Sequence, residues 1–409
     1  MKKILIVNKF LYANGGSETY IFELGKQFQK EGHEVQYFGM QDERNIVGNH
    51  VQSYTQNMDF HGGKLSKLLY PFKIIYSLEA RRAIRKVLED FKPDVVHLNN
   101  FNFQITPSII YEIKKYEKQT EAAVKILFTA HDYQLVCPNH MLRCPKTEEN
   151  CGRCIDGAYV NCVKGNCIHN SKLKSILGAL EGYFYKYLKT YQHIDVVICP
   201  SRFMQEKLEH NPVLRGKTVV MHNFATVKET TAVKEVAGEK RTGSESEYAV
   251  YFGRYSKEKG IETLVRACSR LPHRKFIFAG KGPLEELVNK TVNIENRGFL
   301  EGKELEDLIR GARFSIYPSQ WYENCPFSVM ESIQYGTPVL GADIGGIPEL
   351  IDESCTGELF ESGNAEELAE KMEELWNDSE RIENYSRNCL EKKFDSLGEY
   401  CELLENMFH

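Results

Sequence analysis

The stretch FSIYPSQWYENCPFSVME, residues 314–331, gives the clearest sign of the fold of this chain. Residues 314–317 are an apolar run typical of a strand, and Pro318 ends that run because proline cannot donate to a sheet ladder. Pro326 suits the start of a helix, where its missing N–H costs nothing. The stretch therefore predicts a strand, a turn and a helix, the repeating unit of α/β proteins.

Two carboxylates stand eight positions apart in this stretch. Glu323 falls in the predicted turn and Glu331 in the second turn of the helix, which places them about 10 Å apart at 1.5 Å rise per residue. That separation suits two parts of one hydroxyl-rich ligand, a sugar at Glu323 and a ribose at Glu331. Helix-start amides would point at the ligand between them. The residues of this segment are Asn324, Cys325, Pro326 and Phe327. Two solvated glutamates are the structural alternative.

Short apolar runs alternate with helical periodicity along the whole chain. The ten runs are 4–8, 35–39, 95–99, 126–130, 196–199, 219–222, 248–252, 275–279, 314–317 and 338–342. This alternation predicts an α/β protein with two doubly wound, Rossmann-like domains, and 409 residues are enough for both. We expect a first domain at 1–212, with a cysteine-rich insertion at 137–167, and a second domain at 213–385.

Glycines and cations follow two of the predicted strands. The run NGGSE at 14–18 opens a helix, and Gly16 allows close backbone approach to an anion there. The run GRYSKEKG at 253–260 also precedes a helix, and its Gly253, Arg254 and Lys259 predict a diphosphate site. An ordinary turn and a solvated pair of cations are the structural alternatives.

These motifs resemble the retaining family-four glycosyltransferases of the GT-B fold, also called glycosyl transferases group 1. The family carries Glu-x7-Glu with Pro-Phe inside it, Gly-Gly-x-Glu and Gly-Arg-x4-Lys-Gly, and all three patterns stand in this sequence. The resemblance implies transfer of a sugar from a nucleoside-diphosphate sugar, with UDP favoured as the nucleotide. It also implies a C-terminal helix, at 386–409, that crosses back to the first domain.

The same resemblance assigns roles to single residues. His131, in the segment TAHDY at 129–133, would contact the transferred sugar. Arg254 and Lys259 would bind the diphosphate. Further donor-binding positions implied by the family are Ser201, Asn223, Gly282 and Phe299. Ser201 also precedes a predicted helix, and capping alone would explain it.

The sequence contains no Asp-x-Asp pair to hold a divalent metal ion. Arg254, Lys259 and helix-start amides would balance the charge of the leaving diphosphate instead, by electrostatic preorganisation. In this scheme Glu323 positions the sugar and is not a covalent nucleophile. We therefore expect that catalysis requires no cofactor.

Six cysteines lie within 31 residues, from Cys137 to Cys167. Four of them have spacings that a structural zinc site can use. The predicted ligands are Cys151, Cys154, Cys162 and Cys167. A loop of reduced thiols is the alternative.

Charge and hydropathy limit the partners. A net charge of −5 argues against a nucleic-acid binder. The sequence contains no run of 18 apolar residues, so it predicts no membrane-spanning helix. Two stretches that combine lysines with aromatic residues, 64–76 and 172–189, are candidates for peripheral membrane contact. We expect a cytoplasmic protein that acts on a glycan or polyprenyl-linked acceptor in cell-surface polysaccharide synthesis. Peripheral contact would place it at the inner face of the cell membrane.

Three other classes of protein remain open from the sequence. A glycoside hydrolase would use the two glutamates about 5 to 9.5 Å apart and would have no use for Arg254 and Lys259. A sugar-nucleotide epimerase of the same fold would need no acceptor. A non-catalytic binding protein would tolerate replacement of Glu323.

Overall fold

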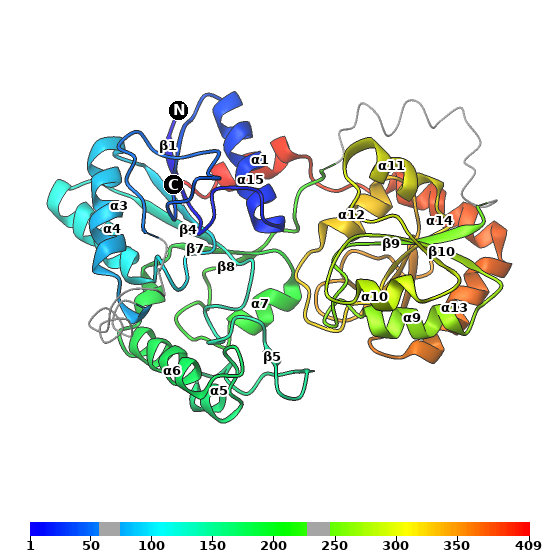
Figure 1. Cartoon of the computed structure of the whole chain (residues 1–409). Helices are drawn as coiled ribbons and strands as arrows, with labels where there is room; N and C mark the ends of the chain where they lie inside the picture. Colours follow the sequence, from blue (N-terminus) through cyan, green and yellow to red (C-terminus); the bar gives the residue numbers. More distant parts are fainter. Residues whose placement is uncertain (57–73, 227–245) are drawn as a thin grey trace. The chain divides into compact units, whose positions relative to one another are not determined.

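The chain forms two compact units in a computed structural model, which describes residues 1–56, 74–226 and 246–409. The first unit comprises Met1–His222 and Leu397–His409, and the second comprises Asn223–Ser396. Figure 1 shows a sheet flanked by helices in each. Most of the lysine-rich stretch 64–76, a candidate for membrane contact, lies outside the described residues.

The first unit is built on a parallel sheet of six strands in the order β2-β1-β3-β4-β7-β8. The strands are β1 (Lys3–Val7), β2 (Glu34–Phe38), β3 (Val95–Leu98), β4 (Lys125–Thr129), β7 (Val196–Cys199) and β8 (Thr218–Val220). Its α-helices before Asn223 include α1 (Gly16–Lys30), α3 (Leu78–Phe91), α4 (Ser108–Thr120), α5 (Val160–Lys164), α6 (Lys172–Tyr187) and α7 (Arg202–Leu208). A single 3-10 turn, η1 (Thr190–His193), follows α6.

The second unit repeats this plan with the order β11-β10-β9-β12-β13-β14. Its strands are β9 (Tyr248–Phe252), β10 (Lys275–Ala279), β11 (Ile294–Asn296), β12 (Ser315–Tyr317), β13 (Val339–Asp343) and β14 (Gly357–Glu361). Its helices are α9 (Ile261–Ser269), α10 (Glu285–Asn289), α11 (Gly302–Gly311), α12 (Phe327–Gln334), α13 (Ala365–Asn377) and α14 (Ser379–Glu391). Two parallel, doubly wound sheets confirm the predicted fold class.

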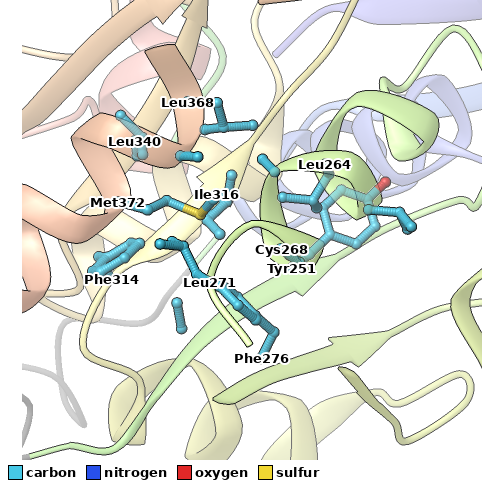
Figure 2. Packing of buried hydrophobic residues seen from close by; sticks show 14 of the residues in the cluster. Tyr251, Leu264, Cys268, Leu271, Phe276, Phe314, Ile316, Leu340, Leu368 and Met372 are labelled. Atoms are coloured by element: carbon cyan, nitrogen blue, oxygen red, sulfur yellow. The ribbon is translucent and has the colours of Figure 1, made fainter. Parts of the chain in front are cut away.

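The core of the second unit lies between its sheet and two of its helices. Figure 2 shows Tyr251, Phe276 and Ile316 of the sheet packing together with Leu264 of α9 and Met372 of α13. All five side chains are almost fully buried. The alternate strand residues Val250 and Phe252 pack with Ile309 of α11 in a separate cluster. Because both faces of the parallel sheet are covered, its strands are nearly continuous apolar runs, the pattern that predicts them from the sequence.

Several element boundaries differ from the sequence expectations. The run at 219–222 was assigned to the second domain, but β8 pairs with β7 in the first sheet, so the chain enters the second unit at Asn223 and not at 213. Strands β11 and β14 were not predicted. β11 has three residues, and β14 contains two glutamates and a glycine, so neither has a strong apolar signal.

The C-terminal segment is two helices and not one. Helix α14 ends at Glu391 in the second unit, and α15 (Leu397–Glu405) packs on α1 in the first. The Tyr20 and Tyr400 hydroxyls are 3.0 Å apart, and the rings of Phe28 and Phe408 have centroids 5.9 Å apart. Figure 1 shows α15, near the C-terminus, beside α1, near the N-terminus.

Candidate active site

The order of the strands indicates where each sheet can bind a ligand. In both sheets the chain changes its direction of winding between two neighbouring strands, β1 and β3 in the first unit and β9 and β12 in the second. Ligands of open α/β sheets bind at the carboxyl ends of the strands at such a point. In this chain, polar side chains gather at both places.

In the second unit, the loops that follow β9 and β12 meet in what we call the Glu323 cluster: Lys259, Tyr317, Ser319, Trp321 and Glu323. The Lys259 Nζ donates to Glu323 Oε1 at 2.6 Å, and the Ser319 hydroxyl donates to the same oxygen at 2.9 Å. The indole N–H of Trp321 also donates to it. The Glu323 side chain is only 9% exposed. The carboxylate is therefore held in one orientation by three donors.

Lysine 259 keeps its charge in this environment. Burial by itself lowers the pKa of Lys259, but the Glu323 carboxylate and Tyr317 outweigh it, and the pKa lies above its ordinary value. Burial, and then Glu323, raise the pKa of Tyr317 to about 12. The sequence predicted Lys259 as a diphosphate ligand, whereas in the structure its ammonium group is paired with Glu323.

Glycines pack against the backbone of Glu323 and of the nearby Pro318. Gly345 follows β13 with a φ of 62°, and a Cβ there would lie 2.4 Å from the Glu323 carbonyl oxygen. The next amide, of Gly346, donates to that same oxygen at 2.8 Å. A Cβ on Gly260 would lie 1.7 Å from the Pro318 carbonyl oxygen, so glycine lets the start of α9 reach the end of β12. These contacts explain both glycines by backbone packing around the cluster.

The glycine loop after β9 presents a second cation. Gly253 has a φ of 144°, which favours glycine, and Arg254 beside it is exposed. A Cβ on Gly282 would lie 2.3 Å from the Tyr255 carbonyl oxygen, so this glycine is explained by contact between two loops. Within the described residues no ion pair involves the Arg254 guanidinium.

Most of the other predicted donor-side residues lie in α12 or beside it. Glu331 accepts a hydrogen bond from the Thr226 hydroxyl at 3.1 Å, and burial raises the pKa of Glu331. The Asn223 side-chain amide donates to the Cys325 carbonyl at 2.7 Å, and the Asn223 Oδ1 is buried with no partner among the described residues. The remaining predicted residues of this group are Asn324, Pro326, Phe327 and Phe299. Pro326 precedes α12, Phe327 is its first residue, and Phe299 is 63% exposed.

In the first unit, the carboxyl ends of β1, β3 and β4 form a network that we call the His131 cluster: Asn8, Glu18, Asn99, Asn100 and His131. The Asn8 amide donates to Glu18 Oε1 at 2.9 Å, which ties the end of β1 to the first turn of α1. The His131 Nε2–H donates to Asn99 Oδ1 at 2.9 Å. Gly16, predicted near an anion, is the first residue of α1.

The histidines of this region are neutral at pH 7. Burial, and then the nearby His97, lower the pKa of His131 to about 3, and burial lowers the pKa of His97 to about 4. Burial also raises the pKa of Asp132 to about 7. His131 can therefore donate or accept a hydrogen bond, but it does not bring a positive charge to the site.

Sequence reasoning missed most members of the two clusters. Asn8 and Asn99 directly follow β1 and β3, so their place after a strand was a usable signal. Ser319 and Trp321 stand inside the stretch 314–331, but no local pattern shows that they point at Glu323. Ser201, by contrast, accepts from the Met204 amide at 3.1 Å as a buried helix cap, the structural alternative.

The four cysteines predicted to bind zinc do not lie within the distances of one zinc site. Ligands of one zinc ion at Zn–S distances of about 2.3 Å lie no more than about 4.6 Å apart. Among the described residues, the one set of three possible ligand atoms within 4.8 Å of one another contains no cysteine. Cys154, Cys162 and Cys167 belong to an apolar cluster with Tyr159. The Cys151 sulfur instead accepts from Arg153 at 3.2 Å.

The set that does come together is Glu31, His33 and Glu405. The Lys2 amide donates to His33 Nδ1 at 3.0 Å, so the imidazole proton of the neutral ring is on Nε2. That nitrogen lies 2.9 Å from Glu405 Oε1 and donates to it. A nitrogen that carries a proton has no lone pair for a metal ion. This group is therefore a hydrogen-bonded tie between α15 and the loop that follows α1.

Solved structures match the whole chain. A structure of the Anabaena protein HepE in complex with UDP matches with a TM-score of 0.66 at 14% identity, over 100% of this chain and 99% of that one. Sucrose-phosphate synthase from Thermosynechococcus elongatus matches with a TM-score of 0.68 at 16% identity, over 100% and 98%. At these identities the likeness shows the fold, which is GT-B.

Sequence comparison identifies the family. An uncharacterized 42.6 kDa protein in the cps region of Klebsiella pneumoniae is 24% identical over 373 residues, which are 85% of this chain and 87% of that protein. The family model "Glycosyl transferases group 1" matches residues 234–392. The model "Glycosyltransferase Family 4" matches residues 14–228, more than half of the chain. The protein is therefore a member of glycosyltransferase family 4, a family of retaining enzymes with the GT-B fold.

Proposed function

We propose that this enzyme transfers a sugar from a UDP-sugar to a glycan or lipid-linked acceptor in cell-surface polysaccharide synthesis. The observation that carries the donor assignment is the Glu323 cluster at the point where the second sheet changes its direction of winding. UDP as the nucleotide is supported by the HepE structure, which holds UDP. The pathway is supported by the Klebsiella relative, which is named for a cps region.

On the donor side, Lys259 and Arg254 have different roles, although the sequence predicts that both bind the diphosphate. Lys259 fixes the Glu323 carboxylate, which hydrogen-bonds the sugar hydroxyls through its remaining acceptor capacity. The exposed guanidinium of Arg254, together with the amides that open α12, receives the leaving diphosphate. Because Glu323 is engaged by three donors, we assign it to positioning and not to nucleophilic attack.

On the acceptor side, His131 is proposed to contact the transferred sugar as a neutral imidazole. Its Nε2–H is engaged by Asn99, which fixes both the ring and its tautomer. The Glu18–Asn8 hydrogen bond holds the start of α1, with Gly16, at the same edge of the sheet. A neutral ring at this place favours hydrogen bonding to a hydroxyl over ion pairing with phosphate.

The proposed chemistry needs no metal ion, in keeping with the family. A structural zinc ion in the cysteine segment remains a separate prediction, and the thiols would have to move closer together to share it. The described helices include none that is long and apolar enough to cross a bilayer. Action on a lipid-linked acceptor at the inner face of the cell membrane therefore implies peripheral contact.

A nucleotide-binding experiment tests the proposal. We would measure the thermal shift of the protein with UDP, GDP, ADP and CMP, with EDTA present throughout. A ligand at 100 times its dissociation constant adds about 2.7 kcal/mol of stability, so a clear shift with UDP is expected. Arg254→Ala should weaken that shift. If none of the four nucleotides shifts the melting temperature, the donor assignment is wrong.

A product assay separates the transferase from its rivals. With a UDP-sugar alone, an epimerase would convert the donor without an acceptor, whereas a transferase is expected to release UDP only slowly. Adding a polyprenyl-linked saccharide should accelerate the release of UDP. A binding protein would show the thermal shift without either reaction, and Glu323→Gln would change nothing further.

A further inference from the structure

Helix α6 has an unusual distribution of side chains. Three of its four buried residues are small, namely Ser175, Gly178 and Ala179, and the fourth is Tyr185. A Cβ on Gly178 would lie 2.3 Å from the Ile168 side chain, and one on Gly182 would lie 2.7 Å from the Tyr159 ring. The helix therefore packs closely on the cysteine-rich segment through its small residues, and most of its large apolar residues lie on the other side.

That other side is what we call the α6 outer face: Leu173, Ile176, Leu180, Tyr183, Phe184 and Tyr187. Their exposed fractions are 68%, 36%, 51%, 40%, 37% and 87%. At 3.6 residues per turn all six fall within an arc of about 100°. Globular proteins usually turn such a stripe toward their core. A contiguous exposed apolar stripe marks an interaction surface.

The charged residues of α6 and its ends are almost all lysines. Lys172, Lys174, Lys186 and Lys189 are exposed at the two ends of the helix. The one acidic residue of the segment is Glu181, and burial raises its pKa to about 8, so it is largely uncharged at pH 7. The chain as a whole has a net charge of −5, so this basic surface is a local feature.

We propose that the α6 outer face binds the surface of an anionic lipid bilayer, with the helix lying in the plane of the headgroups. Amphipathic helices that bind in this way combine an apolar stripe with flanking lysines. A second copy of the chain is disfavoured as the occupant, because two like-charged lysine sets would meet around the stripe. Figure 1 shows α6 at the edge of its unit, away from the sheet. The inference rests on the proposed lipid-linked acceptor.

The test is flotation of the full chain with vesicles of phosphatidylcholine containing phosphatidylglycerol, compared with phosphatidylcholine alone. Wild type is expected to bind the anionic vesicles, and binding should weaken as salt is added. The double variant Leu180→Glu/Tyr187→Glu should bind about tenfold more weakly or worse, since two apolar contacts become two repelled charges. Both positions are exposed, so the variant is expected to fold.

Val292→Glu is the matched control, because Val292 is a fully exposed apolar residue far along the chain in the second unit. It should bind vesicles within about twofold of wild type. Absence of binding to anionic vesicles, or equal binding by wild type and the double variant, overturns the proposal. So does a wild-type dimer that the double variant converts to monomer. The UDP thermal shift, measured without vesicles, reports separately on the transferase assignment.

Discussion

Three side chains converge on one carboxylate oxygen of Glu323, and this convergence defines the candidate site at the scale of single residues. The Lys259–Glu323 pair is largely buried, with the two side chains 23% and 9% exposed. A buried ion pair contributes little net stability, but removing one partner leaves an uncompensated charge. The pair therefore serves to hold a carboxylate in a fixed orientation more than to stabilise the fold.

A double-mutant cycle tests this coupling. Lys259→Met and Glu323→Gln should each lower the free energy of unfolding by about 2–3 kcal/mol. The double variant should be more stable than the sum of the single effects predicts, by about 1 kcal/mol or more. Each single variant should also lower the rate of transfer about a hundredfold. Urea denaturation and a UDP-release assay provide the measurements, and additive stability effects would contradict the assignment.

The buried His97 imidazole is expected to make the stability of the fold depend on pH. It lies 2.8 Å from the Thr129 hydroxyl, and burial lowers its pKa from 6.5 to about 4. The unfolded chain therefore binds one more proton than the folded chain between these values, and stability due to His97 is full above pH 6.5 and is lost as pH falls toward 4. His131 contributes in the same direction. Asp132, with its raised pKa, contributes in the opposite one.

His97→Gln should consequently reduce the loss of stability on acidification. At 1.36 kcal/mol per pH unit and proton, the variant should lose about 2 kcal/mol less than wild type between pH 6.5 and pH 5. Urea unfolding at a series of pH values measures this difference. Parallel curves for the two proteins would show that His97 has the same pKa in the folded and unfolded chains.

At the scale of elements, the site depends on how closely the loops after the strands approach one another. Gly345, after β13, and Gly302, at the start of α11, have nearly the same φ, 62° and 59°. A Cβ would meet the Glu323 backbone at Gly345, but nothing within 4 Å at Gly302. The two positions thus share the same backbone strain and differ in the space available.

Gly345→Ala and Gly302→Ala form a matched pair. Each should lose about 1–2 kcal/mol of stability because a left-handed conformation disfavours alanine. Gly345→Ala should lose more stability than Gly302→Ala, because the backbone at Glu323 must shift to make room for the Cβ. For the same reason it should also lower the transfer rate. Thermal unfolding and the UDP-release assay measure both effects. Equal losses in the two variants would mean that the turn can move without affecting the site.

The cysteine segment shows the same dependence on packing. Its thiols were predicted as metal ligands from spacing alone, but spacing fixes neither direction nor burial. Burial raises the pKa of Cys154 to about 12. The neighbouring Cys167, hydrogen-bonded to Cys162, has its pKa lowered to about 7. Thiols with such different pKa values are not equivalent metal ligands. Cys154 and Cys162 instead belong to a small apolar cluster that packs against Ala179 of α6.

At the scale of the whole molecule, the C-terminal helix joins the last residues of the chain to the first unit. Leu404 of α15 is fully buried, whereas Leu403 beside it is 42% exposed. Leu404→Asp places an unpaired charge between α15 and its neighbours and should lower the free energy of unfolding of the first unit by about 3 kcal/mol or more. Leu403→Asp should change it by less than about 0.5 kcal/mol.

Calorimetry and limited proteolysis measure the outcome. The low-melting transition of Leu404→Asp should belong to the first unit, and cleavage should begin near α15. The Tyr20–Tyr400 hydrogen bond also links α15 to the region of His131, whose ring centroid is 4.9 Å from that of Tyr20. Loss of UDP-dependent stabilisation is not expected, because the donor-side residues lie in the second unit. A wild-type melting profile for Leu404→Asp would contradict the role given to α15.

The sequence by itself determined the properties that depend on near neighbours. Alternation of apolar runs with helical periodicity predicted both parallel sheets, because each buried strand must be apolar over its whole length. Pro318 and Pro326 correctly marked the end of β12 and the start of α12. The motifs around Glu323, Arg254 and Gly16 were sufficient to predict the family, which the family models confirm.

Only the tertiary structure decided the properties that depend on distant partners. Lys259 and Glu323 are 64 positions apart, and His131 and Asn99 are 32 apart. Their pairings follow from which strands are neighbours in a sheet, and no local pattern specifies that order. For the same reason β8 joined the first sheet, and α6 turned its large apolar side chains outward. Local sequence sets the conformation of each segment, whereas packing between segments selects which side chains meet.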